Sequence, residues 1–179
     1  MYKLLPVYLT VFVLFSSILF AQNTINIPAD YPTIQEGINA ASDGDIVLVA
    51  DGTYLENINF TGKGITVASQ FLVDGDKSHI ENTIIDGSQP AHIDTGSVVI
   101  FNSNEDTTSI LCGFTITGGT GTRFGAFREG GGILIAETSP VIKNNIIENN
   151  EVVGSDAVWG SAISIYSAYN ATTIIENNI

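Results

Sequence analysis

The fold is decided by two stretches in the second half of the chain, GGGILIAETSPVIKNNIIENN (130–150) and GSAISIYSAYNATTIIENN (160–178). The two stretches repeat one pattern, since the Ile-x-Ile motif at 133–135 recurs at 163–165, an offset of 30 residues. Short apolar segments that recur at a near-constant spacing are the signature of a repeat architecture. Each copy is too small to bury its own apolar face, so successive copies are stable only when they stack.

The same pattern extends back toward the first half of the chain. IKNNI (142–146) matches IENNI (175–179) at an offset of 33, and ILCGFTITGG (110–119) matches VIKNNIIENN (141–150) at an offset of 31. TIIDG (83–87) matches TITGG (115–119) at an offset of 32. In SVVIF (97–101), Val98 and Ile100 lie opposite Ile133 and Ile135, at an offset of 35. Loops of unequal length between short strands explain why the offsets drift. We therefore predict a parallel β-solenoid whose inward Ile and Val side chains form columns.

Paired asparagines recur where the strand segments end, at 144–145, 149–150 and 177–178. Asparagine tolerates left-handed backbone angles, and its amide can bond to the neighbouring copy. We expect a ladder of asparagines at these corners. Cys112 alternates within a strand segment and is expected to be a small core residue, and a single cysteine excludes an intrachain disulfide.

A single helix is predicted, over PTIQEGINAA (32–41). Thr33 and Glu36 form a capping box, and Ile34, Ile38 and Ala41 give the helix one apolar face. After it the apolar period becomes two, in DIVLVA, ENINF and GITVAS, as in strands. The expected task of the helix is to cover the open edge of the first coil.

The helix segment, the strands that follow it, and the motifs TIIDG, CGFTITGG and SPVIKNNIIENN resemble the secreted pectin-lyase-like superfamily. The resemblance covers roughly residues 25–179 and implies an all-β, right-handed parallel β-helix with a short N-terminal amphipathic capping helix. It specifies the activity poorly, because that superfamily includes polysaccharide lyases, glycoside hydrolases, phage tailspikes and adhesins. Ile179 falls in the middle of a repeat, so we expect that further coils follow the domain at 22–179.

Residues 1–21 read as a signal peptide, because Lys3 is followed by eighteen uncharged residues that end at Ala21. The alternative is an uncleaved membrane anchor. Cleavage predicts a secreted or cell-surface protein with no membrane-spanning domain. The chain has 19 acidic and 6 basic residues, a net charge of −13, which argues against nucleic acid and anionic membranes as partners.

Three loops leave equivalent corners of successive coils, at 88–96, 120–130 and 151–160, and are expected to lie side by side on one flank. The flank gathers aromatic, basic and acidic side chains that suit a sugar polymer, namely His92, Asp94, Arg123, Phe124, Phe127, Arg128, Glu129, Asp156 and Trp159. The alternative is that the aromatic side chains fold inward and pin the loops to the solenoid.

Catalysis has less support in the sequence. A glycosidase needs paired carboxylates, and the acidic strand motifs of the resembling hydrolases are absent. Lys143, expected near Arg123 or Arg128 through stacking, would complete a set of residue types found in lyases, but no lyase motif surrounds it. The favoured alternative is that Lys143 is an ordinary solvated strand residue. Asp74 and Asp76 in VDGDKSHIE (73–81) are the candidates for calcium, but an Asp-Gly-Asp segment is commonly just a turn and the EF-hand pattern is not met.

The function predicted from the sequence is polysaccharide or surface-glycan binding without demonstrable catalysis, by a monomer without a cofactor. The first alternative is a lyase, before a glycoside hydrolase, acting on uronic-acid polymers, with calcium as its cofactor. The second alternative is an adhesin or structural stalk.

Overall fold

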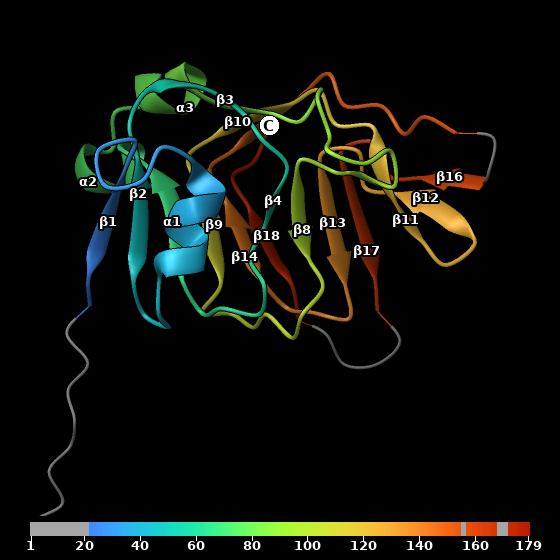
Figure 1. The fold of residues 1–179 in the computed structure, drawn as a ribbon, viewed down its shortest axis with the longest axis horizontal. Helices are drawn as coiled ribbons and strands as arrows, with labels where there is room; N and C mark the ends of the chain where they lie inside the picture. The colour runs from blue at the N-terminus through green and yellow to red at the C-terminus, as the bar shows by residue number, and fades with distance from the viewer. Residues whose placement is uncertain (1–21, 155–156, 168–171) are drawn as a thin grey trace, which may run out of the picture.

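The structure, a computed structural model, describes residues 22–154, 157–167 and 172–179, so the predicted signal peptide lies outside the described residues. The described part is mostly β-structure, with several parallel sheets and three helices (Figure 1). Sheet A contains β1 (Thr24–Ile27), β2 (Ile46–Val49), β5 (Thr66–Ser69), β9 (Ile110–Cys112), β14 (Val141–Lys143) and β18 (Ile174–Glu176). Sheet B contains β3 (Gly52–Leu55), β6 (Thr83–Asp86), β10 (Thr115–Thr117) and β15 (Ile146–Ile147).

Two further sheets complete the β-structure. Sheet C contains β4 (Ile58–Asn59), β8 (Val99–Phe101), β13 (Ile133–Ala136) and β17 (Ile163–Tyr166). Sheet D contains β7 (Thr95–Gly96), β11 (Gly121–Phe124), β12 (Phe127–Glu129) and β16 (Ala157–Trp159). All strand pairs of sheets A, B and C are parallel, whereas sheet D is mixed.

The core consists of columns of apolar register partners, as the repeats predict. The columns are Ile25, Val47, Val67, Leu111, Ile142 and Ile175 in sheet A; Tyr54, Ile85, Ile116 and Ile147 in sheet B; and Ile58, Val99, Ile133 and Ile163 in sheet C. Their central members are fully buried. Full burial of one such side chain contributes about 1.5–3 kcal/mol, so the columns are the main source of stability.

Two of the predicted registers are wrong by one residue. Ile133 pairs with Val99 rather than Val98, and Ile116 pairs with Ile85 rather than Ile84. A slip of one residue exchanges the two faces of a strand. In β8 the choice of face is made by Phe101, whose ring packs on Phe60 with the centroids 4.3 Å apart. The registers predicted for 110–119, 130–150 and 160–178 are confirmed.

The asparagine ladder is also confirmed. Asn144, Asn149 and Asn177 have positive φ angles of 57°, 54° and 54°. Asn145 is 1% exposed, and its amide group donates to the Oδ1 of Asn178 at 3.0 Å. The corners of successive strands are therefore bonded to one another through side chains.

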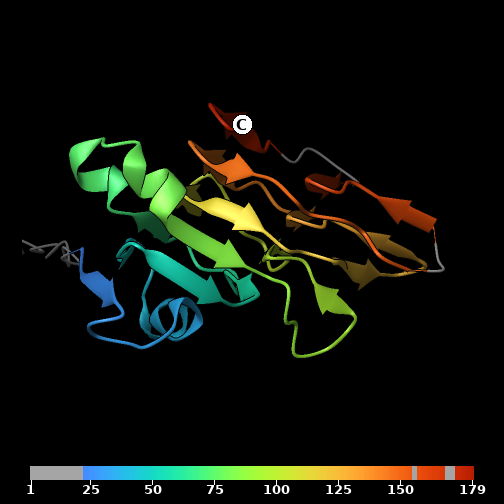
Figure 2. The ribbon, with the colours of Figure 1, turned by 90° about the horizontal axis from the view of Figure 1, so that it is seen from above.

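Helix α1 (Ile34–Ala40) begins where the capping signal predicts, with the Thr33 hydroxyl accepting from the Glu36 backbone N–H. Its apolar face, with Ile34 and Ile38 fully buried, contacts β1, β2 and β4. Figure 2 shows α1 beside β1 at one end of the stack of strands and the C-terminal strand at the other end. The helix thus covers the first strands.

Two short helices between β5 and β6 correct the prediction of a single helix. Helix α2 (Phe71–Asp74) ends at Gly75, which has a φ of 74°, and α3 (Ser78–Asn82) follows. Elements of four and five residues are too short for an apolar period to appear, so the segment resembles a turn in the sequence. None of the helices among the described residues has the length and hydropathy needed to cross a bilayer.

Candidate functional site

Sheet D is built from the three loops that the sequence places on one flank. The loop at 88–96 supplies β7, the loop at 120–130 supplies the hairpin β11–β12, and the loop at 151–160 supplies β16. The strands pair in the order β7, β11, β12, β16, with the last pair parallel. The loops therefore form a small sheet at one end of the long axis (Figure 1).

Arg128 holds this sheet together. Its side chain is 6% exposed, and Nη2 forms an ion pair with Asp94 Oδ1 at 2.8 Å. Nη1 donates to the carbonyls of Ile93 and Gly121, at 2.5 and 3.0 Å. Nε has no hydrogen-bond partner in the described part of the chain. The guanidinium thus joins the 88–96 loop to the hairpin, and both of its Nη atoms are already bonded to groups of the protein.

Two aromatic rings lie exposed on the sheet. Phe127 is 43% exposed and Trp159 is 59% exposed, so the alternative in which they fold inward is wrong for both. Their ring centroids lie 6.5 Å apart with an interplanar angle of 76°. Phe127 and Glu129 are the first and last residues of β12, and Glu129 is the register partner of Trp159 on β16. The rings come from different loops, and only the sheet brings them together.

The rings and the arginines lie on opposite faces of sheet D. Successive residues of a strand point to opposite sides, so Phe127 and Arg128 are separated by the sheet. Arg123 is the register partner of Arg128 and lies on the arginine face, with its side chain exposed. The aromatic face and the basic face are therefore two different surfaces.

The other flank residues have varied surroundings. The His92 side chain is 68% exposed, and its Nδ1 accepts from the Asp94 backbone N–H at 3.1 Å. Glu129 is 7% exposed and accepts a 2.7 Å hydrogen bond from the Ser164 hydroxyl, which joins sheet D to sheet C. Phe124 ends β11, and Asp156 lies outside the described residues.

Lys143 does not join this flank. It lies on β14 of sheet A, where its register partners are Cys112 and Glu176. Stacking therefore places it beside those two residues, in a different sheet from Arg123 and Arg128 (Figure 1). Cys112 is buried, as predicted, and burial raises the pKa of its thiol.

The calcium candidates form turns. Asp74 Oδ1 accepts from the Asp76 backbone N–H, and Asp76 Oδ1 accepts from the Ser78 backbone N–H, both at 2.9 Å. The hydrogen bonds from Ser78 lower the pKa of Asp76. In the described ranges, no three His, Cys, Asp or Glu side chains are grouped so that they can hold a metal ion.

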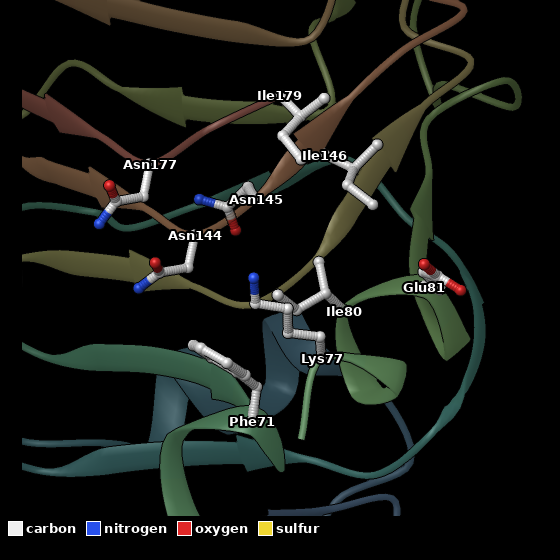
Figure 3. A pocket seen from close by; sticks show the side chains of 9 residues that line it. All are labelled: Phe71, Lys77, Ile80, Glu81, Asn144, Asn145, Ile146, Asn177 and Ile179. Carbon is white, nitrogen blue, oxygen red and sulfur yellow. The ribbon is translucent and has the colours of Figure 1, made fainter. Parts of the chain in front are cut away.

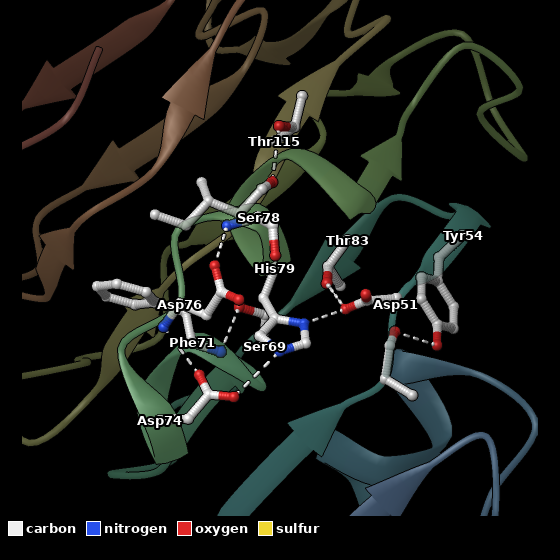
Figure 4. A network of polar contacts seen from close by, with 12 residues as sticks. Asp51, Tyr54, Ser69, Phe71, Asp74, Asp76, Ser78, His79, Thr83 and Thr115 are labelled. Atoms are coloured by element: carbon white, nitrogen blue, oxygen red, sulfur yellow. Dashed lines mark hydrogen bonds and ion pairs between the residues drawn. The ribbon is translucent and has the colours of Figure 1, made fainter.

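Near these turns, His79 contacts two aspartates, and no sequence motif predicts these contacts. His79 Nδ1 lies 2.6 Å from Asp51 Oδ1, and Nε2 lies 3.2 Å from Asp74 Oδ2 (Figure 4). Only an imidazolium can donate from both nitrogens. The hydrogen bond to Asp51 is the main cause that raises the pKa of His79. Asp51 and His79 are 28 residues apart, without a motif that links them, so only the fold reveals the pair.

Sheet D combines an exposed pair of rings with a rigid, ion-paired support, an arrangement suited to stacking on the apolar face of a flat ligand. The carboxylate of Asp94 is paired with Arg128, and the carboxylate of Glu129 accepts a hydrogen bond from Ser164. Comparison of the sequence with protein-family models and with curated proteins found no match.

Proposed function

We propose that this chain is a right-handed parallel β-helix protein of the pectin-lyase-like type that binds polysaccharide on the aromatic face of sheet D, without catalysis. Support for the fold comes from the order of pairing. The chain passes repeatedly from sheet A to sheet B to sheet C and back to sheet A, and each return adds a parallel strand beside the previous one. Export, followed by action outside the cytoplasm, is proposed from the leader-like residues 1–21.

The observation that carries the binding proposal is the exposed pair Phe127 and Trp159. Large apolar side chains usually bury their area, and two rings left exposed side by side on a sheet favour a ligand with flat apolar faces. The pyranose rings of a polysaccharide have such faces. A chain of net charge −13 repels polyanions at long range, so neutral polymers are favoured over polyuronates at low salt.

Binding is favoured over catalysis by what the charged residues do. Arg128 is held by Asp94 and two carbonyls, and Glu129 is held by Ser164. Lys143 lies in another sheet. A lyase needs a base beside a cation that neutralises the uronate carboxylate, and these residues do not supply that set together.

The test uses Trp159, the single tryptophan of the chain, as its reporter. We expect soluble polysaccharides to shift its fluorescence in a saturable manner. Phe127→Ala removes one ring and is expected to weaken binding roughly tenfold, equivalent to about 1.4 kcal/mol. Tyr31→Ala is the matched control, because Tyr31 is 37% exposed and lies outside sheet D.

The outcomes separate the candidate functions. A fluorescence signal that ignores neutral and acidic polymers alike contradicts binding and favours the stalk or adhesin. A rise in ultraviolet absorbance from unsaturated uronate products, abolished by Arg123→Ala or Lys143→Ala, contradicts the absence of catalysis and favours the lyase. Both readouts are repeated with and without calcium, because the lyase alternative would use it.

A further inference from the structure

A pocket of about 330 Å³ lies far from sheet D, between α3 and the asparagine corners of sheet A (Figure 3). Its lining residues come from the α2–α3 segment, from the ends of β14 and β18, and from the start of β15; they are Phe71, Lys77, Ile80, Glu81, Asn144, Asn145, Ile146, Asn177 and Ile179. The volume suits a ligand of about ten non-hydrogen atoms, at the small end of ligand sites. The α2–α3 segment is the insertion that interrupts the strand repeat, and insertions on a rigid scaffold commonly carry binding residues.

The pocket contains a cation without a protein partner. Figure 3 shows the Lys77 ammonium pointing toward Asn145. Lys63 donates to three carbonyls at the end of α1, and Arg128 is paired with Asp94, whereas the exposed Lys77, like Lys143, has no such contact among the described residues. Within the described residues Lys77 has no ion pair or side-chain hydrogen bond. In a chain of net charge −13, an unpaired ammonium in a concave site is complementary to an anion.

Two asparagines line the same pocket as Lys77, and the amide of one of them, Asn144, is bonded to Cys112 Sγ. Asn144 and Asn177 occupy equivalent corners of successive strands, and both have left-handed backbone angles. Figure 3 shows their side chains on the same side of the pocket. Asn177 makes no side-chain hydrogen bond to the described residues. An amide N–H beside an ammonium can donate to the same carboxylate.

The opposite part of the pocket is apolar. Ile80, Ile146 and Ile179 gather there, and Phe71 lies across from them (Figure 3). Glu81 also lines the pocket, but its carboxylate points away from Lys77 in that view. The lining therefore matches a ligand with a carboxylate at one end and an apolar body at the other.

The wall of the pocket is held in place before any ligand arrives. His79 of α3 bonds to Asp74 of α2 and to Asp51 outside the segment, and the Thr115 hydroxyl donates to the Ile80 carbonyl at 2.8 Å (Figure 4). Ile80 is itself 8% exposed. A preformed wall lowers the entropy lost on binding.

We propose that this pocket binds a small organic carboxylate with an apolar body, whose carboxylate contacts Lys77 and Asn177 and whose body packs on Phe71 and Ile80. The site is independent of the polysaccharide face, since it uses none of the residues of sheet D.

The test is an NMR titration of the full chain with phenylacetate, which carries a carboxylate on an aromatic body. We expect the backbone amides of Phe71, Lys77 and Asn144 to shift, and those of Phe127 and Trp159 to stay in place. Phenylacetamide, which has the same shape without the charge, is expected to bind at least tenfold more weakly. Phenethylamine, which reverses the charge, is expected not to bind.

Lys77→Gln is expected to weaken phenylacetate binding roughly tenfold. Lys143→Gln is the matched control, because Lys143 is a lysine outside the pocket, and it is expected to leave the affinity unchanged. Equal affinity for phenylacetate and phenylacetamide in the unaltered chain overturns the proposal, as does tighter binding of phenethylamine through Glu81. Failure of this test leaves the fluorescence test of sheet D unaffected, so the two proposals fail separately.

Discussion

Asn145 is a polar side chain kept inside an apolar stack by complete hydrogen bonding. Its Oδ1 accepts from the Phe114 backbone N–H, and its Nδ2 donates to the carbonyls of Leu111 and Lys143. The same Nδ2 and the backbone N–H both donate to Asn178 Oδ1. Buried polar groups are costly unless paired, so each corner specifies the register of the next one.

Asn145→Ala is expected to lower the free energy of unfolding by about 3 kcal/mol, because several buried backbone groups lose their partners. Asn178→Ala is expected to cost about 1 kcal/mol, since the outer asparagine is partly exposed. The measurement is urea denaturation of both variants. Equal losses of unfolding free energy in the two variants would show that the burial of the asparagine does not determine the size of the loss.

His79 makes the stability depend on pH. Its folded-state pKa is raised above the usual 6.5, chiefly by the hydrogen bond to Asp51. Its contribution is therefore fully present below about pH 6.5 and is lost as the pH rises through the folded-state pKa. We expect the unfolding temperature to fall as the pH rises above 6.5, the usual histidine pKa, and through the folded-state pKa.

The control for this dependence is the other histidine. His79→Gln is expected to remove the slope, whereas His92→Gln, which replaces a side chain that is 68% exposed, is expected to retain it. Differential scanning fluorimetry across the pH range measures both. An unchanged slope in His79→Gln would assign the effect to other groups.

Helix α1 is held at both of its ends. Thr33 caps its N-terminus, and Lys63 Nζ donates to the carbonyls of Ile38, Asn39 and Ala41, each at 2.7 Å. A cation is favourable at a helix C-terminus because it meets the unpaired carbonyls and the negative end of the dipole. A lysine from the loop between β4 and β5 thereby anchors the helix.

Lys63→Met keeps most of the aliphatic chain and removes the ammonium. We expect it to lower the free energy of unfolding by about 1–2 kcal/mol. Lys143 makes no such contacts, so Lys143→Met is expected to change the free energy of unfolding by less than about 0.5 kcal/mol. Guanidinium denaturation compares the two variants, and equal effects would argue against the helix contact.

Sheet D depends on its buried guanidinium in the same way. Arg128→Met leaves Asp94 and two carbonyls without their donor, so we expect a loss of about 3 kcal/mol in unfolding free energy. Asp94→Asn keeps an acceptor oxygen near Arg128 and is expected to cost about 1 kcal/mol. Denaturation followed by Trp159 fluorescence measures both, and a smaller loss in Arg128→Met than in Asp94→Asn would contradict the assignment.

Along the stack, each strand of sheets A to C is stabilised mainly by its two neighbours. β9 is paired on both sides, by β5 and β14, whereas β18 pairs only with β14 among the described strands. In β18 all three residues are exposed. Stability in such an arrangement is a sum of nearest-neighbour terms.

Native-state hydrogen exchange is therefore expected to be slowest in the central strands. We expect the Leu111 amide of β9 to exchange at least tenfold more slowly than the Ile175 amide of β18. NMR-detected exchange measures this difference. Uniform protection along the chain would indicate that it unfolds as a single unit.

The sequence by itself determined the repeats, the capping helix, the asparagine corners and the flank on which three loops meet. These features follow from spacing, local propensity and turn chemistry, which are properties of short segments and are therefore visible in one dimension. The offset between 133–135 and 163–165 was correct because both copies keep the same Ile-x-Ile spacing.

Only the tertiary structure decided the faces of β6 and β8, the exposure of Phe127 and Trp159, and the contact between His79 and Asp51. SVVIF and TIIDG contain adjacent apolar residues, so their alternation does not select an inward face. That choice depends on which distant side chains fill the remaining space, such as Phe60 against Phe101. Contacts of this kind join residues far apart in the chain, and no local pattern records them.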